Sequence, residues 1–266
     1  MKGIRGWRAL TAAAPDGFLS GMHTIAQPQD YFAARTILLS PRYALQPLEY
    51  DDVLLAGHHL TGDRQGLRIY DMAPSQWHPL GIRIAGRTAV ELTRDEHAAF
   101  IADAAAQTIE ASGAAIPAIV DPFVGSGNLL FHLARRFPAA RAVGIDNSSE
   151  ISRATASNFN RLQVAAELML DDWTAMPRIV AALYVVCPPW GDAFGPDGLD
   201  LRRTTPPVPD ILAALPRPGY ALVQMKTDTV SASIDAIDVG NTALPTLRSG
   251  NPDIDRLMTY RLLVLR

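Results

Sequence analysis

Residues 187–190, Cys-Pro-Pro-Trp, directly follow an apolar run at residues 181–186. Proline has no backbone N–H and cannot donate to a sheet ladder, so the pattern predicts a buried strand that ends here. The carbonyl oxygens of Cys187 and Pro188 are then available as hydrogen-bond acceptors, and Trp190 offers a flat aromatic surface. Acceptors beside an aromatic platform suit a planar substrate that bears an amine, and we expect Pro189 to line the same place.

A second stretch, residues 121–128 (Asp-Pro-Phe-Val-Gly-Ser-Gly-Asn), is typical of the loop between a strand and a helix in an open α/β sheet. Gly125 and Gly127 allow a tight turn and the close approach of a ligand. Asp146 ends the next predicted strand, where an acid typically accepts hydrogen bonds from two ribose hydroxyls. Taken alone, the pattern also suits nicotinamide and flavin proteins. However, a third glycine is missing at the dinucleotide spacing, and Asp121 would repel a pyrophosphate while attracting a sulfonium or an ammonium.

With these motifs in this order, the sequence resembles the class I S-adenosylmethionine-dependent methyltransferases. Residues 121–128 are similar to the first motif of that family, residues 144–146 to the second, residues 170–173 to the third and residues 187–190 to the fourth. The resemblance covers about residues 80–266. The resemblance is greatest to the trimethylguanosine synthase-like branch, which has Ser-Pro-Pro-Trp-Gly where this chain has Cys-Pro-Pro-Trp-Gly. That branch also has one segment similar to residues 92–95 of this chain and another similar to residues 198–207.

The resemblance implies a cofactor, S-adenosylmethionine, and roles for individual residues. Asp121 would face its methionine end, Asp146 its ribose and Asp172 the adenine amine, with Trp173 beside the adenine ring. Thr93 would approach the cofactor carboxylate. The complete expected cofactor set is Thr93, Asp121, Gly125, Gly127, Asn128, Asp146, Asn147, Asp172 and Trp173.

The expected catalytic residues are Cys187, Pro188 and Trp190. The expected substrate residues are Pro189, Trp190, Arg202, Arg203 and Lys226. No metal site is expected, because the neighbouring histidines at 58 and 59 have no cysteine or acid at ligand spacing.

Each of these roles has a plainer alternative. Trp173 could be a core residue, and Cys187 a small buried hydrophobe or a nucleophile. Arg202 and Arg203 could be a solvated pair, and Lys226 a solvated strand end. His132, on the helix after the glycine loop, is expected to be packed rather than catalytic.

The elements that must position these residues begin near Thr93, which we expect to be the N-cap of a helix with Glu96 completing a capping box. Strands and helices then alternate, which predicts a parallel sheet with helices on both faces. The strands are expected at residues 118–123, 141–146, 166–173, 181–190 and 219–226, and the helices at residues 128–137, 148–163 and 209–215. Two β-prone runs around a turn at residues 249–253 predict an antiparallel hairpin at the sheet edge.

We therefore predict an α/β fold, a Rossmann-like seven-stranded methyltransferase sheet with an antiparallel C-terminal hairpin. Residues 89–266 would form the methyltransferase domain. Residues 1–88 would form an irregular, partly β extension or substrate cap, because short β-prone runs recur at residues 35–40, 52–57 and 66–72.

The composition narrows the function further. The net charge is −3, which disfavours a long nucleic-acid partner. A single cysteine excludes an intrachain disulfide, no apolar run reaches the length of a membrane span, and no secretory signal is recognisable, so we expect a cytoplasmic protein without a membrane partner. The sequence leaves the oligomeric state open.

The leading hypothesis is N-methylation of an amine on a planar heteroaromatic substrate, either nucleobase-like or a natural-product small molecule. The alternatives are a methyltransferase acting on a short RNA or DNA element, a non-catalytic module that binds the cofactor, and, more distantly, a nicotinamide oxidoreductase.

Overall fold

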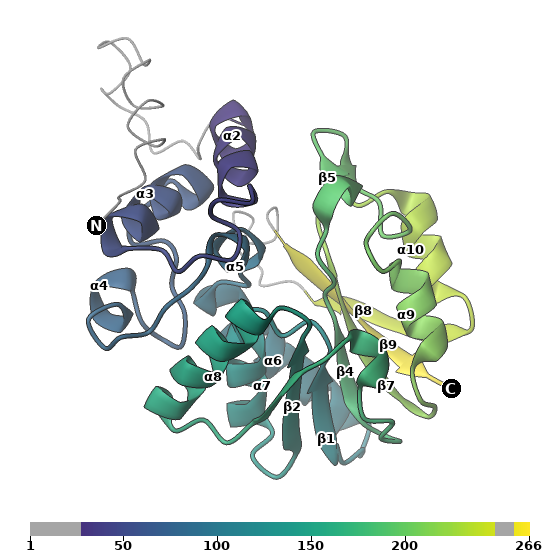
Figure 1. Ribbon diagram of the computed structural model, residues 1–266. Helices are drawn as coiled ribbons and strands as arrows, with labels where there is room; N and C mark the ends of the chain where they lie inside the picture. Colours follow the sequence, from purple (N-terminus) through teal and green to yellow (C-terminus); the bar gives the residue numbers. More distant parts are fainter. Residues whose placement is uncertain (1–27, 248–257) are drawn as a thin grey trace. The chain divides into compact units, whose positions relative to one another are not determined.

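The structure is a computed structural model that describes residues 28–247 and 258–266 (Figure 1). The chain divides after Arg94 into two compact units. This division lies six residues beyond the predicted boundary at residue 88. Among the described residues, no helix is both long and apolar enough to cross a membrane.

The N-terminal unit is helical in two of the three segments where the sequence suggested strands. Its helices are α2 (Pro28–Leu38), α3 (Tyr50–Thr61), α4 (Pro74–Trp77) and α5 (Gly86–Glu91). The expectation of strands at residues 35–40 and 52–57 was wrong, because most of the first run continues α2 and the second lies inside α3. Residues 66–72 form only an isolated bridge between Ile69 and Met72.

Helical spacing explains why these runs are not strands. In α2, Ala34 and Leu38 are four residues apart and both are buried. In α3, Asp51 and Asp52 lie in the first turn, where they favour a helix start, and Gly62 ends the helix with a φ of 78°. Between Ile69 and Met72 the chain turns through Tyr70 and Asp71, both with positive φ.

The second unit is built on a seven-stranded sheet. Its strand order is β3-β2-β1-β4-β7-β9-β8. The strands β3, β2, β1, β4 and β7 run parallel, whereas β9 is antiparallel to β7 and β8 is antiparallel to β9. The bounds are β1 (Ala118–Asp121), β2 (Arg141–Asp146), β3 (Glu167–Leu170), β4 (Leu183–Val186), β7 (Gly219–Met225), β8 (Asn241–Leu247) and β9 (Thr259–Leu265). This arrangement confirms the predicted fold class.

Helices cover both faces of this sheet, as predicted. Figure 1 shows α6, α7 and α8 on one side and α9 and α10 on the other. Their bounds are α6 (Asp95–Ala111), α7 (Asn128–Arg136), α8 (Ser149–Leu162), α9 (Val208–Ala214) and α10 (Ser231–Asp238). The two strands of the C-terminal hairpin are β8 and β9, and the predicted turn between them lies outside the described residues.

Smaller elements follow β3 and β4. One is the short 3-10 helix η1 (Trp173–Ala175), which replaces the end of the longer strand predicted at residues 166–173. After β4 come η2 (Gly191–Ala193) and a two-stranded hairpin of β5 (Phe194–Gly195) and β6 (Gly198–Leu199). Helix α6 begins at Asp95, so Arg94, rather than the predicted Thr93, precedes its first residue.

Candidate functional site

The glycine loop after β1 adopts backbone angles that favour glycine. Gly125 has a φ of 50° and Gly127 a φ of 74°. A Cβ on Gly127 would also lie 2.7 Å from the ring of Phe159 and 2.9 Å from the side chain of Thr155, both on α8. Gly127 is therefore required for its conformation and for the close approach of α8.

Hydrogen bonds hold this loop against the next strand and helix. The amide of Val124 donates to the carbonyl of Ile145 on β2 at 2.8 Å, and the hydroxyl of Thr155 donates to the carbonyl of Gly125 at 2.5 Å. Asn128, the first residue of α7, is buried. The loop is thus fixed at the carboxyl end of β1.

Asp121 is a buried acid at the start of this loop. It is 4% exposed, and its Oδ1 accepts a hydrogen bond from the amide of Phe123 at 3.1 Å. Burial raises the pKa of the Asp121 carboxyl to about 7, and the nearby charge of Asp146 raises it further, against the lowering effect of the Phe123 amide. A positive charge placed beside Asp121 would favour its ionised form.

Asp146 ends β2, on the strand next to β1. Its side chain is 4% exposed, and its Oδ1 accepts a hydrogen bond from the amide of Ser148 at 2.8 Å. Asn147 follows and is exposed. The acids of the first two motifs therefore lie at the carboxyl ends of neighbouring strands.

The segment after β3 adds an exposed acid and an aromatic ring. Asp172 begins η1, where its Oδ1 accepts hydrogen bonds from the amide and the hydroxyl of Thr174 at 3.0 and 2.7 Å. These bonds lower the pKa of the Asp172 carboxyl. The ring of Trp173 stacks towards that of Phe123, with centroids 6.4 Å apart and planes at 29°. Trp173 is only partly buried, so it lies at this edge of the sheet rather than in the core.

Residues 187–190 (Cys-Pro-Pro-Trp), called the Trp190 segment from here on, follow β4. The four residues of β4 are all buried, and the strand ends at Val186. The thiol of Cys187 donates a hydrogen bond to Oε1 of Gln224 on β7, and Nε2 of Gln224 donates to Sδ of Met258 at 2.7 Å. Pro188 is buried, whereas Pro189 and Trp190 are partly exposed. The Trp190 ring packs edge-to-face on Phe194, with centroids 5.3 Å apart.

The three predicted basic residues differ in their surroundings. Arg202 is exposed and forms two bonds with Asp200, at 3.0 and 2.8 Å. Arg203 is also exposed. Lys226 follows β7, its side chain is 18% exposed, and its ammonium lies 4.4 Å from the centroid of the Phe194 ring. Lys226 thus contacts the same Phe194 ring against which Trp190 packs.

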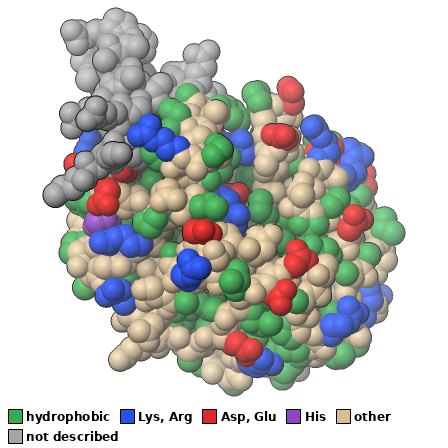
Figure 2. All heavy atoms as spheres, viewed as in Figure 1, with side chains coloured by type: hydrophobic (Ala, Val, Ile, Leu, Met, Phe, Trp, Pro, Cys, Tyr) green, Lys and Arg blue, Asp and Glu red, His purple; other side chains and the backbone are tan. Residues whose placement is uncertain are grey.

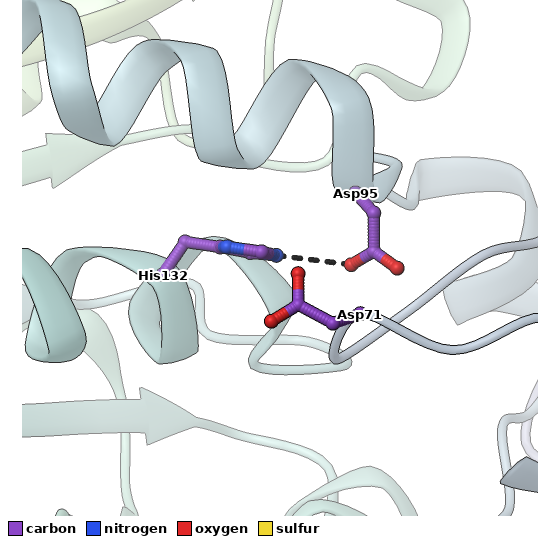
Figure 3. A group of neighbouring side chains, drawn as sticks. All are labelled: Asp71, Asp95 and His132. Atoms are coloured by element: carbon purple, nitrogen blue, oxygen red, sulfur yellow. Dashed lines mark hydrogen bonds and ion pairs between the residues drawn. The ribbon is translucent and has the colours of Figure 1, made fainter.

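Two other expectations concern Thr93 and His132. Thr93 belongs to the N-terminal unit, so its predicted contact with a cofactor stays a prediction. His132 is buried, and its Nε2 lies 2.9 Å from Oδ1 of Asp95 (Figure 3). Because this pair joins α7 to α6, it suits the packed role expected for His132.

Sequence reasoning missed Phe123, Phe194 and Gln224. Phe123 lies within the glycine-loop motif, and Phe194 lies just after the Cys-Pro-Pro-Trp motif. Their ring contacts depend on how the loops after the strands fold. Gln224 could have been noticed as an amide in the apolar run of β7, since a buried amide needs hydrogen-bond partners.

No protein-family model matches this chain, and no curated protein matches it. Matches to solved structures include an S-adenosylmethionine-dependent methyltransferase from Clostridium acetobutylicum, with 10% identity, coverage of 62% of this chain and 91% of that one, and a TM-score of 0.48. Another is magnesium protoporphyrin IX methyltransferase from Synechocystis with bound S-adenosylmethionine, with 13% identity, coverage of 65% and 82%, and a TM-score of 0.46. A third is an rRNA methylase from Streptococcus thermophilus, with 18% identity, coverage of 66% and 99%, and a TM-score of 0.41.

These structure neighbours are methyltransferases, and their sequence identity to this chain is low.

Proposed function

We propose that this protein is an S-adenosylmethionine-dependent methyltransferase that methylates an amine on a planar heteroaromatic substrate. The observation that carries the proposal is the order of four segments along one edge of the sheet. The order β3-β2-β1-β4 sets side by side the strands that lead to Asp172, Asp146, Asp121 and the Trp190 segment. In open α/β sheets, ligands bind outside the carboxyl ends of the strands, where the strand order reverses.

The residues at this edge fit S-adenosylmethionine. Asp121 supplies a buried carboxyl that suits the positive charge of a sulfonium or an ammonium, and that would oppose a pyrophosphate. Asp146 would accept hydrogen bonds from the ribose hydroxyls, and Asp172 from the adenine amine. The rings of Phe123 and Trp173 offer flat surfaces for adenine.

The remaining cofactor residues are proposed from the backbone of the glycine loop, from their position along the chain and from the resemblance. The backbone at Gly125 and Gly127 would let the cofactor approach closely, beside Asn128. Asn147 follows Asp146 at the same strand end. Thr93 remains proposed from the resemblance alone.

When bound, the cofactor supplies a methyl group on a sulfonium. The task of the protein is to place the amine nitrogen in line with that methyl group, which is catalysis by proximity and orientation. Trp190 would stack on the planar ring, beside Pro189. The carbonyls of Cys187 and Pro188 would accept the amine hydrogens, which turns the nitrogen lone pair away from the ring and towards the methyl group.

The hydrogen bond of the Cys187 thiol helps to decide which atoms accept the amine hydrogens. Because it donates its hydrogen to Gln224, that hydrogen is engaged within the sheet, and sulfur is a weak acceptor. The backbone carbonyls are therefore the stronger acceptors at this position. This supports orientation by the backbone and speaks against Cys187 as a nucleophile.

A small substrate is proposed in preference to a long nucleic acid. The net charge is −3, and on the face shown in Figure 2 basic and acidic side chains are interspersed rather than gathered by sign. We also propose that the amine is guanine-like, as in the trimethylguanosine synthase-like branch. The N-terminal unit would act as a substrate cap.

The proposal is tested by methyl transfer from a labelled cofactor to a panel of heteroaromatic amines. Stacking on one ring contributes about 1–3 kcal/mol, so Trp190→Ala should lower kcat/KM by about 10- to 100-fold, while Trp190→Phe should retain most of it. The affinity for S-adenosylmethionine should stay unchanged in both variants. Full turnover by Trp190→Ala would contradict the platform, and methylation confined to RNA or DNA elements would replace the small-molecule substrate.

A further inference from the structure

Lys226 is a largely buried cation beside the Trp190 segment. Its side chain is 18% exposed, and its ammonium lies over the ring of Phe194 at 4.4 Å from the centroid. Burial lowers the pKa of the Lys226 ammonium, against the opposite effect of Asp228. A lysine usually keeps its ammonium in water, so this position calls for an explanation.

The backbone around Lys226 is firmly held. The amide of Lys226 donates to the hydroxyl of Thr229 at 2.8 Å, and that hydroxyl donates to the carbonyl of Lys226 at 2.7 Å. Gly198 of the small hairpin has a φ of 105°, and a Cβ there would lie 2.2 Å from the carbonyl oxygen of Asp228. The amide of Val230 also donates to the carbonyl of Leu199 at 2.9 Å. The loop that carries Lys226 is therefore closely packed on the hairpin that carries Phe194.

Lys226 and Arg202 differ in how closely an acidic side chain approaches their charge. The ammonium of Lys226 lies 4.0 Å from a carboxylate oxygen of Asp228, a side chain that is half exposed. By contrast, Arg202 makes a two-point contact with Asp200 at hydrogen-bond distances. The charge of Arg202 is thus closely matched, whereas that of Lys226 is only loosely matched.

The position of Lys226 relates it to the proposed aromatic platform. Phe194 contacts the Trp190 ring edge-to-face and also carries the ammonium of Lys226. Both groups therefore lie against one phenylalanine, the Trp190 ring with its centroid 5.3 Å and the Lys226 ammonium 4.4 Å from the centroid of the Phe194 ring. A ring stacked on Trp190 could then present a substituent to Lys226.

From this geometry we infer that the substrate is a planar aromatic amine that carries an anionic group, a carboxylate or a phosphate, and that Lys226 binds this group. The inference rests on the proposed function, because it takes Trp190 as the surface on which the substrate stacks. Both anions accept charge-assisted hydrogen bonds from an ammonium. A partly buried pair of this kind is also screened by salt much less than an exposed one.

Matched probes that differ only in the anionic group test the inference. The first pair is 4-aminobenzoate and aniline, and the second is guanosine 5′-monophosphate and guanosine. Binding is measured by titration calorimetry on the full chain saturated with S-adenosylhomocysteine. For at least one pair the anionic member should bind about tenfold more tightly, and the pair that shows this identifies carboxylate or phosphate as the anion.

Two variants connect the preference to Lys226. Lys226→Met keeps an apolar stem but removes the charge, so the preference should disappear. Arg141→Met removes a charge that is matched by Glu167 at the amino-terminal end of β2, away from the proposed site, so the preference should remain. Affinity for S-adenosylhomocysteine should be unchanged in both variants.

The inference is overturned if neither anionic probe binds more tightly than its neutral counterpart, or if Lys226→Met keeps the preference. These results leave the proposed function standing when the protein still binds S-adenosylmethionine and its turnover still depends on Trp190. Loss of cofactor binding in the unaltered protein would instead refute the proposed function itself.

Discussion

Asp121 is the residue whose charge can be tested most sharply, because its carboxyl is buried and its pKa is raised. We consider the substitution Asp121→Asn, which keeps the shape of the side chain and its ability to accept from the Phe123 amide. An asparagine cannot bind or release a proton. Any effect of pH on stability that comes from Asp121 should therefore vanish in the variant.

The size of this effect follows from the pKa. Burial raises it from 3.8, the value of an unperturbed aspartate, to about 7 in the folded protein. One pKa unit corresponds to about 1.4 kcal/mol, so the free energy of unfolding contains a contribution from Asp121 that changes by up to about 4 kcal/mol. Because the folded state binds the extra proton, this contribution is fully present below about pH 4 and is lost as pH rises through about 7.

The assay is urea unfolding of both proteins at several pH values from 4.5 to 8, followed by tryptophan fluorescence. Relative to the wild type, Asp121→Asn should gain stability as the pH rises from 4.5 to about 7, and the difference should level off above that. The comparison between variants cancels other groups that titrate independently. Asp172→Asn is the control, because the pKa of Asp172 is lowered, so its effect should stay flat above pH 5.

The same variant tests the proposed role towards the cofactor. A sulfonium or ammonium beside Asp121 favours its ionised form, so affinity of the wild type for S-adenosylmethionine should increase as pH rises through about 7. The cofactor amine also titrates near this pH, and its effect remains in Asp121→Asn. If the difference in stability between the wild type and Asp121→Asn does not depend on pH, the reasoning about burial is refuted. If the affinity for S-adenosylmethionine depends on pH equally in the two proteins, the contact between Asp121 and the cofactor is refuted.

Three further substitutions test the loop, the ribose contact and the sheet end. Gly127→Ala should destabilise the protein by about 1–3 kcal/mol in urea unfolding, because φ is positive and the new methyl group would meet Phe159. Asp146→Ala should weaken S-adenosylmethionine binding about tenfold or more in calorimetry, since two charge-assisted hydrogen bonds would be lost; unchanged affinity would contradict the ribose contact. Gln224→Met should lower stability by about 1–3 kcal/mol because it removes the acceptor of the Cys187 thiol in a buried place, while the affinity for cofactor should remain.

The sheet of the second unit could be predicted from the sequence because its signals agree with one another. The strand predicted at residues 141–146 coincides with β2, since apolar residues there lie between clear turn signals. The helix predicted at residues 128–137 differs from α7 by one residue, because Gly127 and Phe137 flank a regular helical pattern. Local pattern and tertiary position support the same assignment in both cases.

The N-terminal helices were missed because β-branched and aliphatic residues were weighed above the helix signals. Residues 52–57 read as a strand in isolation, yet Asp51 and Asp52 at the start of the run and Gly62 after it mark the start and end of a helix. For residues 66–72 the decisive feature was the turn at Tyr70 and Asp71, whose positive φ values no propensity indicates.

The candidate site was predictable to the extent that it lies at strand ends. Asp121 and Asp146 end neighbouring parallel strands, so their placement follows from the topology. The stacking of Phe123 with Trp173, and of Lys226 on Phe194, was not predictable, because each joins loops that are far apart in sequence. The pairing of Arg202 with Asp200 depends likewise on the local conformation of an irregular segment.

The most direct test of the central claim is cofactor binding by the full chain. Thermal unfolding would be followed in parallel with S-adenosylmethionine, S-adenosylhomocysteine and NADH, each at about a hundred times a dissociation constant measured by calorimetry where binding is detected. A ligand at that concentration stabilises the folded state by about 2.7 kcal/mol. The account predicts stabilisation by the first two ligands, none by NADH, and a weaker response in Asp146→Ala. Stabilisation by NADH alone, or by none of the three, would contradict it.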